Sequence, residues 1–198
     1  MYPWRPLPKR RGAVAPRRCG FSLLELLIAV ALASVLLAAG APSFMSMLQD
    51  DRIRSRIDSL LTDVDFARLK AVERDQDVVL CRSSDGRHCQ RSARAQADWS
   101  AGWIVYVNTD GNKKRDAGEP LLEARAALTG GMTLSFNQWW RVVYHGDGSA
   151  RSGTFVLCDS RGPRHARALI LYYTGRPRVS ARSADGGPLV CPSGGPGS

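Results

Sequence analysis

The most constraining feature of this 198-residue sequence is an apolar stretch at residues 21–41, which contains a single ionisable side chain, Glu25. A helix of about 20 apolar residues is long enough to cross the roughly 30 Å hydrocarbon core of a bilayer. Residues 1–20 carry six lysines and arginines and no acid, and such basic flanks stay on the cytoplasmic side. The sequence therefore predicts a cytoplasmic leader at 1–20, a transmembrane helix over 21–42, and an external domain after it.

A cleaved secretory signal is the alternative, because small residues follow the apolar run at Ala38, Ala39, Gly40 and Ala41. Glu25 favours the retained helix. A carboxylate inside an apolar membrane helix costs about 2.5–3.5 kcal/mol on insertion scales, and such residues are usually kept for a partner. We therefore expect Glu25 to meet a cationic group.

The residues around Glu25 resemble the class III signal of type IV pilins and type II secretion pseudopilins. They read Arg17-Arg18-Cys19-Gly20-Phe21-Ser22-Leu23-Leu24-Glu25 and continue into the apolar run. The resemblance implies that a prepilin peptidase cuts after Gly20 and methylates the new amino terminus, Phe21. It also implies that Glu25 neutralises the amino-terminal ammonium of a neighbouring pilin in the filament. The expected location is the inner membrane with a periplasmic domain, and then the pilus at the cell surface.

The segment 43–75 has the pattern of an amphipathic helix that continues the membrane helix past Pro42. Apolar residues recur at helical spacing, at Ile53, Ile57, Leu60, Leu61, Val64, Ala67, Leu69 and Val72. Charged residues are assigned to the opposite, solvated face, at Asp50, Asp51, Arg52, Arg54, Arg56, Asp58 and Asp63. We expect the apolar stripe to pack on a globular domain.

Residues 76–191 change to short β-rich runs that are separated by glycine and asparagine clusters. The expected strands are 78–81, 103–107, 132–136, 142–144, 154–158 and 168–173. No internal repeat is evident. The glycine-, proline- and serine-rich end predicts a mobile tail at 192–198.

Several of these segments also resemble the GspH/FimT group of minor pilins, in order and spacing. They are Ala67 to Cys89 with Val79-Leu80-Cys81, Trp99 to Tyr106, Gly153 to Cys158, and Gly175-Arg176-Pro177-Arg178. The resemblance implies an α+β, pilin-like fold. In that fold the second half of a long amino-terminal helix packs against a β-rich domain of two antiparallel sheets.

Four cysteines remain after removal of the leader: Cys81, Cys89, Cys158 and Cys191. An even number on the oxidising side of a membrane favours disulfides, and four thiols allow three pairings. We favour Cys81 with Cys89 and Cys158 with Cys191. A zinc site is the alternative, but the sequence has no CxxC motif, and we expect no metal or other cofactor.

The segment 108–119 places oxygen-bearing side chains at positions 1, 3, 5, 9 and 12 of a calcium loop. Against a calcium site, Lys113 stands where the sharp turn of such a loop needs glycine. Three consecutive cations also lie inside the segment, and Pro120 follows where an exiting helix would begin. We interpret the segment as a hairpin turn, with calcium binding as the open alternative.

The positive charge of the expected mature chain is concentrated near its carboxy terminus. Residues 43–140 hold equal numbers of basic and acidic side chains, whereas residues 141–198 hold eight arginines and three aspartates. Arginine binds phosphate with a bidentate fork. We therefore expect an anion-binding surface that includes Arg161, Arg164, Arg167, Arg176, Arg178 and Arg182. Docking onto acidic pilin neighbours or lipid head groups is the alternative.

In FimT-type minor pilins that serve natural transformation, a GRxR motif near the carboxy terminus contacts DNA. Gly175, Arg176 and Arg178 match this motif, and Thr174-Gly175 is a turn signal that places both arginines on an exposed hairpin. The resemblance thus implies DNA as a partner, bound for uptake. Stacking of unpaired bases on aromatic residues is a further possibility, at Trp139, Trp140, Tyr172 or Tyr173.

An enzyme is not expected, because the sequence has no HExxH, Walker-type loop or GxSxG motif, and its three histidines lie far apart. The rival functions are structural. One is a GspH-type pseudopilin of a type II secretion system, and the other is a minor pilin that primes pilus assembly without binding DNA.

Overall fold

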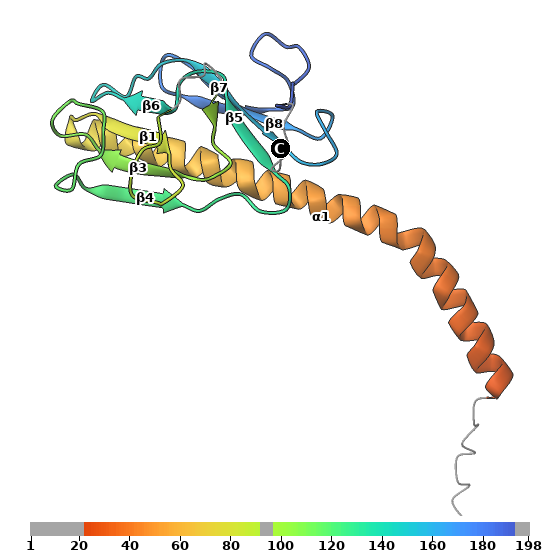
Figure 1. Ribbon diagram of the computed structural model, residues 1–198. Helices are drawn as coiled ribbons and strands as arrows, with labels where there is room; N and C mark the ends of the chain where they lie inside the picture. The colour runs from red at the N-terminus through yellow and green to blue at the C-terminus, as the bar shows by residue number, and fades with distance from the viewer. Residues whose placement is uncertain (1–21, 92–96, 193–198) are drawn as a thin grey trace, which may run out of the picture. The chain divides into compact units, whose positions relative to one another are not determined.

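The computed structural model describes residues 22–91 and 97–192, without the side chains of residues 38–42. It contains one long helix, α1 (Leu23–Arg74), followed by β-strands (Figure 1). The strands are β1 (Val78–Arg82), β2 (Ala97–Asp98), β3 (Trp103–Val107), β4 (Leu121–Arg125), β5 (Thr133–Phe136), β6 (Arg141–Tyr144), β7 (Gly153–Cys158), β8 (Arg167–Leu171) and β9 (Pro177–Ser180).

Helix α1 begins just after Ser22, whose Oγ accepts a hydrogen bond from the backbone N–H of Glu25 at 3.2 Å. A serine in this position satisfies one of the free N–H groups of the first helical turn. The chain forms two compact units, Met1–Met45 and Ser46–Ser198. Over the part of the chain that the structure describes, no helix combines the length and hydropathy of a membrane span.

The second half of α1 packs on the β-domain through one apolar stripe. Its buried members follow each other at alternating spacings of four and three residues: Ile53, Ile57, Leu60, Val64, Ala67 and Ala71. The prediction was wrong for Leu69 and Val72, which are exposed. Each residue advances about 100° around a helix, so these two positions fall outside the stripe.

Asp63 was predicted on the solvated face of the helix, but it is buried. It accepts a hydrogen bond from Trp103 Nε1 at 2.8 Å and a bidentate pair from Arg125, with Nε at 2.9 Å and Nη2 at 2.8 Å. Position 63 is three residues after Leu60 and four before Ala67, so the helix places it beside the apolar stripe. The carboxylate is tolerated there because β3 and β4 bring it partners.

Over the described residues, the nine strands form two antiparallel sheets (Figure 1), with strand orders β4-β3-β1-β6 and β2-β5-β7-β8-β9. Each of the six expected strands is present, although the last ends at Leu171 rather than Tyr173. Strands β2, β4 and β9 were not predicted from the sequence. Strand β2 has two residues, β4 lacks an alternating apolar pattern, and β9 begins with proline, which is typical of edge strands.

The main core lies between the α1 stripe and the inward faces of both sheets. A second, smaller apolar cluster covers the other face of the sheet that contains β7 and β8, and it includes Ala168, Ile170 and Leu189. The α+β, pilin-like fold with a helix on two antiparallel sheets is therefore confirmed. The expected leader at 1–20 and nearly all of the expected tail lie outside the described residues.

Candidate functional site

The candidate site is the hairpin of β8 and β9, at one edge of the five-stranded sheet. The two strands pair antiparallel from Ala168 opposite Ser180 to Leu171 opposite Pro177. Tyr172 closes the turn twice, because its N–H donates to the carbonyl of Arg176 at 3.1 Å and its carbonyl accepts from Gly175 N–H at 2.8 Å. The turn that carries the predicted motif is therefore held by its own backbone.

Gly175 is required by this turn. Its φ is +73°, a left-handed conformation that other residues adopt at a cost. A Cβ at this position would lie 2.0 Å from the carbonyl oxygen of Gly148. The Gly175 carbonyl also accepts a hydrogen bond from the buried Tyr144 hydroxyl at 3.2 Å. Gly175 thus holds the hairpin against the end of β6 and the segment that follows it.

Two arginines project from the turn end of the hairpin. Arg176 is exposed and, among the described residues, has no hydrogen-bond or ion-pair partner for its side chain. Arg178 is exposed in β9, opposite Ile170, and its Nε donates to the Tyr172 hydroxyl at 3.1 Å. Both guanidinium groups are therefore free of carboxylates over the described part of the chain.

The other predicted arginines lie at the opposite end of the hairpin. Arg164 is exposed before β8, Arg167 begins β8, and Arg182 follows β9. The four steps along β8 from Arg167 to Leu171 span about 13 Å, at roughly 3.3 Å per residue. The structure therefore separates the predicted residues into a turn group with Gly175 and a second group at the far end.

Within the far group, two side chains are partly engaged with the backbone. Arg167 Nη1 donates to the Ala166 carbonyl at 2.9 Å, and Arg182 Nη1 donates to the Gly186 carbonyl at 3.1 Å. Arg164 makes no such contact with a described residue. These bonds fix the direction of the guanidinium groups and leave their charge uncancelled.

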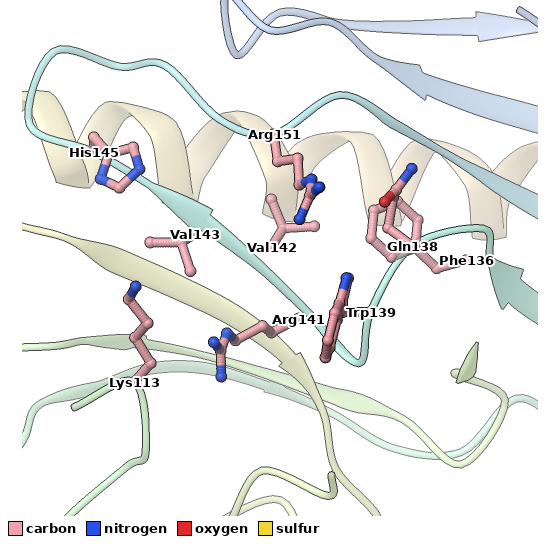
Figure 2. Close-up of a pocket in the computed structure, with 9 residues that line it drawn as sticks. All are labelled: Lys113, Phe136, Gln138, Trp139, Arg141, Val142, Val143, His145 and Arg151. Carbon is pink, nitrogen blue, oxygen red and sulfur yellow. The ribbon is translucent and has the colours of Figure 1, made fainter. Parts of the chain in front are cut away.

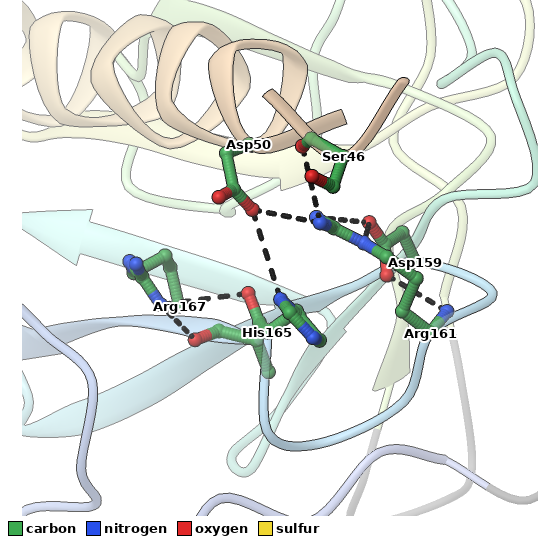
Figure 3. Close-up of polar contacts among 7 residues, drawn as sticks. Ser46, Asp50, Asp159, Arg161, His165 and Arg167 are labelled. Atoms are coloured by element: carbon green, nitrogen blue, oxygen red, sulfur yellow. Dashed lines mark hydrogen bonds and ion pairs between the residues drawn. The ribbon is translucent and has the colours of Figure 1, made fainter. Parts of the chain in front are cut away.

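The assignment of Arg161 to the anion surface was wrong. Its guanidinium forms ion pairs with Asp159 and Asp50, each at 2.8 Å, and its side chain is mostly buried (Figure 3). The hydrogen bond from Arg161 lowers the pKa of Asp50, and the charges of His165 and Arg167 act in the same direction. Arg161 is therefore a structural residue that ties the loop before β8 to helix α1.

The aromatic residues proposed for stacking divide into two classes. Trp140 is buried, whereas Trp139 is 58% exposed. Tyr172 and Tyr173 are both exposed, because they lie in the turn instead of continuing β8. One tryptophan of the first pair therefore faces the core, whereas both tyrosines of the second pair are open to solvent.

Two disulfides form in the structure, Cys81 with Cys89 and Cys158 with Cys191, which is the pairing favoured from sequence. The first closes the loop after β1. The second attaches the carboxy-terminal segment to β7, where Leu189 is buried against Ala166, Ala168 and Ile170. It therefore holds the segment that follows β9 against the sheet that carries the hairpin.

The β3–β4 loop, residues 108–120, is a hairpin connection as interpreted from sequence. The Glu119 carboxylate is buried and accepts hydrogen bonds from Thr109 N–H at 2.7 Å and Asp116 N–H at 3.1 Å. Lys113 adopts a left-handed φ of +60°. No cluster of three or more histidine, cysteine, aspartate or glutamate side chains suited to a metal occurs among the described residues.

At the amino terminus, Gly20 and Phe21 lie outside the described residues. Glu25 lies in the first turn of α1 and is exposed, with exposed leucines on both sides at Leu24 and Leu26. Its carboxylate has no hydrogen-bond or ion-pair partner among the described residues. The described residues thus leave this charge unmatched.

A second cationic cluster was missed in the sequence analysis. Arg141 and Arg151 were counted in the basic carboxy-terminal third but assigned no role. They line a cavity along β6 together with Trp139. The signal that could have found it is the run Trp139-Trp140-Arg141, in which alternation places an aromatic and a cationic side chain on the same face.

Comparison with known proteins agrees with this fold. The family model described as type II transport protein GspH matches residues 56–175, and the model of the prokaryotic N-terminal methylation motif matches residues 15–41. The pilin-like protein PilA1 of Thermus thermophilus is 28% identical over 147 residues, which cover 73% of this chain and 78% of that protein.

The structure is also similar to crystal structures of the type IV minor pilin FimU of Pseudomonas aeruginosa. One crystal form gives a TM-score of 0.51 at 17% identity, over 67% of this chain and 90% of FimU. A second crystal form gives a TM-score of 0.48 at 18% identity, over 64% of this chain and 91% of FimU. The first likeness supports the fold. Because the GspH model covers more than half of the sequence, this chain belongs to the GspH family and is a type IV minor pilin or pseudopilin.

Proposed function

We propose that the mature chain begins at a methylated Phe21 after prepilin peptidase cuts behind Gly20. The match to the methylation motif at residues 15–41 supports this step. The helix that follows would anchor the protein in the inner membrane and later pack with other pilins in the pilus. Glu25 would then meet the amino-terminal ammonium of a neighbouring pilin, which supplies the counter-ion that is missing among the described residues of its own chain.

Mass spectrometry of the protein isolated from its native cells tests this step. The expected amino-terminal peptide begins at Phe21 and carries one added methyl group. An intact leader, or trimming beyond Ala41 that removes the apolar helix, would contradict the filament assignment. Glu25→Ala should lower incorporation into filaments while leaving the chain in the membrane, and Asp51→Ala, which removes an exposed carboxylate of the same helix, is the control.

We propose further that the hairpin arginines bind extracellular DNA for uptake in natural transformation. The observation that carries this proposal is the exposure of Arg176 and Arg178 on a turn that Gly175 holds in place, without carboxylate partners in the part of the chain that the structure describes. Because the backbone of the turn is already held, the two arginines can neutralise phosphates without a large loss of backbone freedom on binding. The two arginine groups lie about 13 Å apart, roughly four rises of 3.4 Å along one DNA strand.

A mobility-shift assay with the full chain in detergent, at low salt, tests the DNA assignment. The double variant Arg176→Ala/Arg178→Ala should bind DNA at least tenfold more weakly than the unchanged protein. The matched control is Arg54→Ala/Arg56→Ala, which removes the same charge at the same spacing from exposed positions on α1. An equal loss of DNA affinity in the two double variants would indicate a non-specific charge effect and would contradict the hairpin assignment.

Gly175→Ala separates geometry from charge. The added Cβ collides with the Gly148 carbonyl, so the turn must move while every arginine remains. We expect weaker DNA binding at unchanged net charge. Binding equal to that of the unchanged protein would show that the turn geometry does not matter.

The second candidate is a GspH-type pseudopilin of a type II secretion system, which the description of the matching family model favours. A pilin that only primes pilus assembly is its close relative in function. The pseudopilin and the assembly-priming pilin both predict that the full chain does not retard DNA in the mobility-shift assay. Both also predict that the hairpin variants still assemble into filaments. Binding to DNA that depends on Arg176 and Arg178 would separate the first candidate from these two.

A further inference from the structure

A cavity of about 280 Å³ opens along β6, an edge strand of the four-stranded sheet (Figure 2). We call it the Trp139 pocket, and its lining includes Lys113, Trp139, Arg141, Val143, His145 and Arg151. These residues come from the β3–β4 loop, from β6 with its two ends, and from the segment before β7. The pocket is therefore built by three connections of the fold and is separate from the β8–β9 hairpin.

The lining of the pocket is cationic. Lys113, Arg141 and Arg151 contribute three positive charges, and the lining that the described residues provide contains no aspartate or glutamate. None of these three side chains forms an ion pair or donates a hydrogen bond to a residue in the described ranges. The nearby carboxylate of Asp77 lies 2.8 Å from His145 Nδ1, so it is engaged by that ring. The pocket thus has charge available for an anion.

Arg141 is held in place within this pocket. Its guanidinium carbon lies 4.4 Å from the centroid of the Trp140 ring, and Arg91 approaches the same ring at 5.9 Å. Burial lowers the pKa of Arg141, and the charge of Arg91 acts in the same direction. An arginine nevertheless stays protonated in proteins. A partly buried, pre-oriented cation without a counter-ion is a strong site for a phosphate oxygen.

Trp139 supplies an exposed aromatic surface beside these cations. Figure 2 shows its ring next to Arg141, with Arg151 and Gln138 nearby. Val143 and Phe136 add apolar lining. A positively charged groove combined with an exposed aromatic ring is the arrangement that binds single-stranded nucleic acid, because the ring stacks on a base while the cations neutralise the backbone.

We propose that the Trp139 pocket binds one unpaired nucleotide, with its base stacked on Trp139 and its phosphate held by Arg141, Arg151 and Lys113. The cavity, at about 280 Å³, lies just below the roughly 300–1,000 Å³ range of ligand pockets, which suits a ligand no larger than a single nucleotide. Bases inside a duplex are already stacked on both faces, so the pocket selects single strands. The proposal rests on the proposed function for its ligand class, DNA, but uses residues distinct from the hairpin.

Fluorescence anisotropy with the full chain in detergent tests the proposal. The two probes are a labelled 12-nucleotide oligo-dT and a labelled 12-base-pair duplex. Trp139→Ala should weaken binding of the single strand about tenfold and leave duplex binding within twofold. Trp139→Phe, which keeps a ring, should restore most of the affinity. Phe44→Ala, which removes a 60% exposed aromatic residue on α1, outside both the pocket and the hairpin, is the control.

A second pair of variants tests the role of the cationic side chains in the pocket. Arg151→Ala should weaken single-strand binding several-fold, whereas Arg87→Ala, an exposed arginine elsewhere, should not. Titration of the unchanged protein with thymidine monophosphate should show weak competition with oligo-dT that is lost in Trp139→Ala. The same competition by an acidic oligosaccharide at lower concentration would show that the ligand class is wrong.

The failure of this inference is distinguishable from failure of the hairpin assignment. If Trp139→Ala and Arg151→Ala bind oligo-dT as well as the unchanged protein, the pocket is not a nucleotide site, whatever the hairpin variants do. If Arg176→Ala/Arg178→Ala leaves both probes bound while Trp139→Ala loses oligo-dT, the hairpin assignment fails and the pocket stands. If the unchanged protein binds neither probe, both assignments are overturned.

Discussion

Removal of the buried Asp63 carboxylate should destabilise the β-domain more than any exposed substitution on α1. Asp63 bridges the helix to both β3 and β4, through Trp103 and Arg125. In Asp63→Ala, the indole N–H of Trp103 loses its partner in a position where water does not reach, because this residue is only 3% exposed. The perturbation thus creates an unsatisfied buried donor and an unpaired arginine.

The expected loss can be estimated from these two terms. An unsatisfied buried donor costs roughly 1–3 kcal/mol. The Arg125 side chain is 41% exposed, so it regains water and its lost pair costs only about 1 kcal/mol. We therefore expect Asp63→Ala to lower the free energy of unfolding by about 3 kcal/mol. Asp63→Asn keeps an acceptor for the indole and should cost about half as much.

Urea unfolding of the full chain in detergent, followed by tryptophan fluorescence, measures this effect. With a urea dependence of about 2 kcal/mol per molar, a loss of about 3 kcal/mol lowers the midpoint by about 1.5 M. Asp58→Ala, an exposed carboxylate on the same helix, is the control and should shift the midpoint by less than about 0.3 M. Equal midpoints for the two variants would refute the stabilising role of Asp63.

Three further predictions concern the disulfides, a carboxylate and the β3–β4 loop. Cys158→Ser/Cys191→Ser removes a cross-link over 33 residues, worth roughly 4 kcal/mol by loop entropy, and should make the carboxy-terminal segment sensitive to limited proteolysis. The pKa of Asp50 is lowered in the folded state, so its pairing with Arg161 stabilises the protein above about pH 4 and is lost as the pH falls below that value. Lower hydrogen-exchange protection near Arg161 at pH 3 than at pH 6, after correction for the intrinsic exchange rate at each pH, checks this. Calcium should leave the melting temperature of the protein unchanged, and a rise that a chelator reverses would instead show a cation site in the β3–β4 loop.

The fold was predictable where one strong pattern dominates. The four-and-three spacing from Ile53 onward marks the buried stripe of α1, and alternating or continuous apolar runs mark six strands. Strand β4 was not predictable because its residues are half-exposed and gain their place by pairing with β3. Asp63 was misplaced because its burial depends on partners 40 and 62 residues away, which no local pattern reveals.

The candidate site was predictable in part. The pair Thr174-Gly175 predicted the turn. The structure explains why glycine is needed there, through its left-handed φ and its close approach to Gly148. Arg161 could not be told from the other arginines by sequence, because its two aspartate partners come together only when the loop before β8 meets α1. The run Trp139-Trp140-Arg141 is a local signal for the Trp139 pocket, but Lys113 and Arg151 join it only in the folded arrangement.

The salt dependence of duplex binding tests the central claim, phosphate neutralisation by the hairpin, most directly. Each phosphate contact contributes about 0.9 to the slope of log affinity against log salt concentration. The account predicts that Arg176→Ala/Arg178→Ala lowers the magnitude of this slope by about 1.8 relative to the unchanged protein. Equal slopes for the double variant and the unchanged protein would contradict the account, because they would mean that neither arginine displaces a counter-ion from DNA.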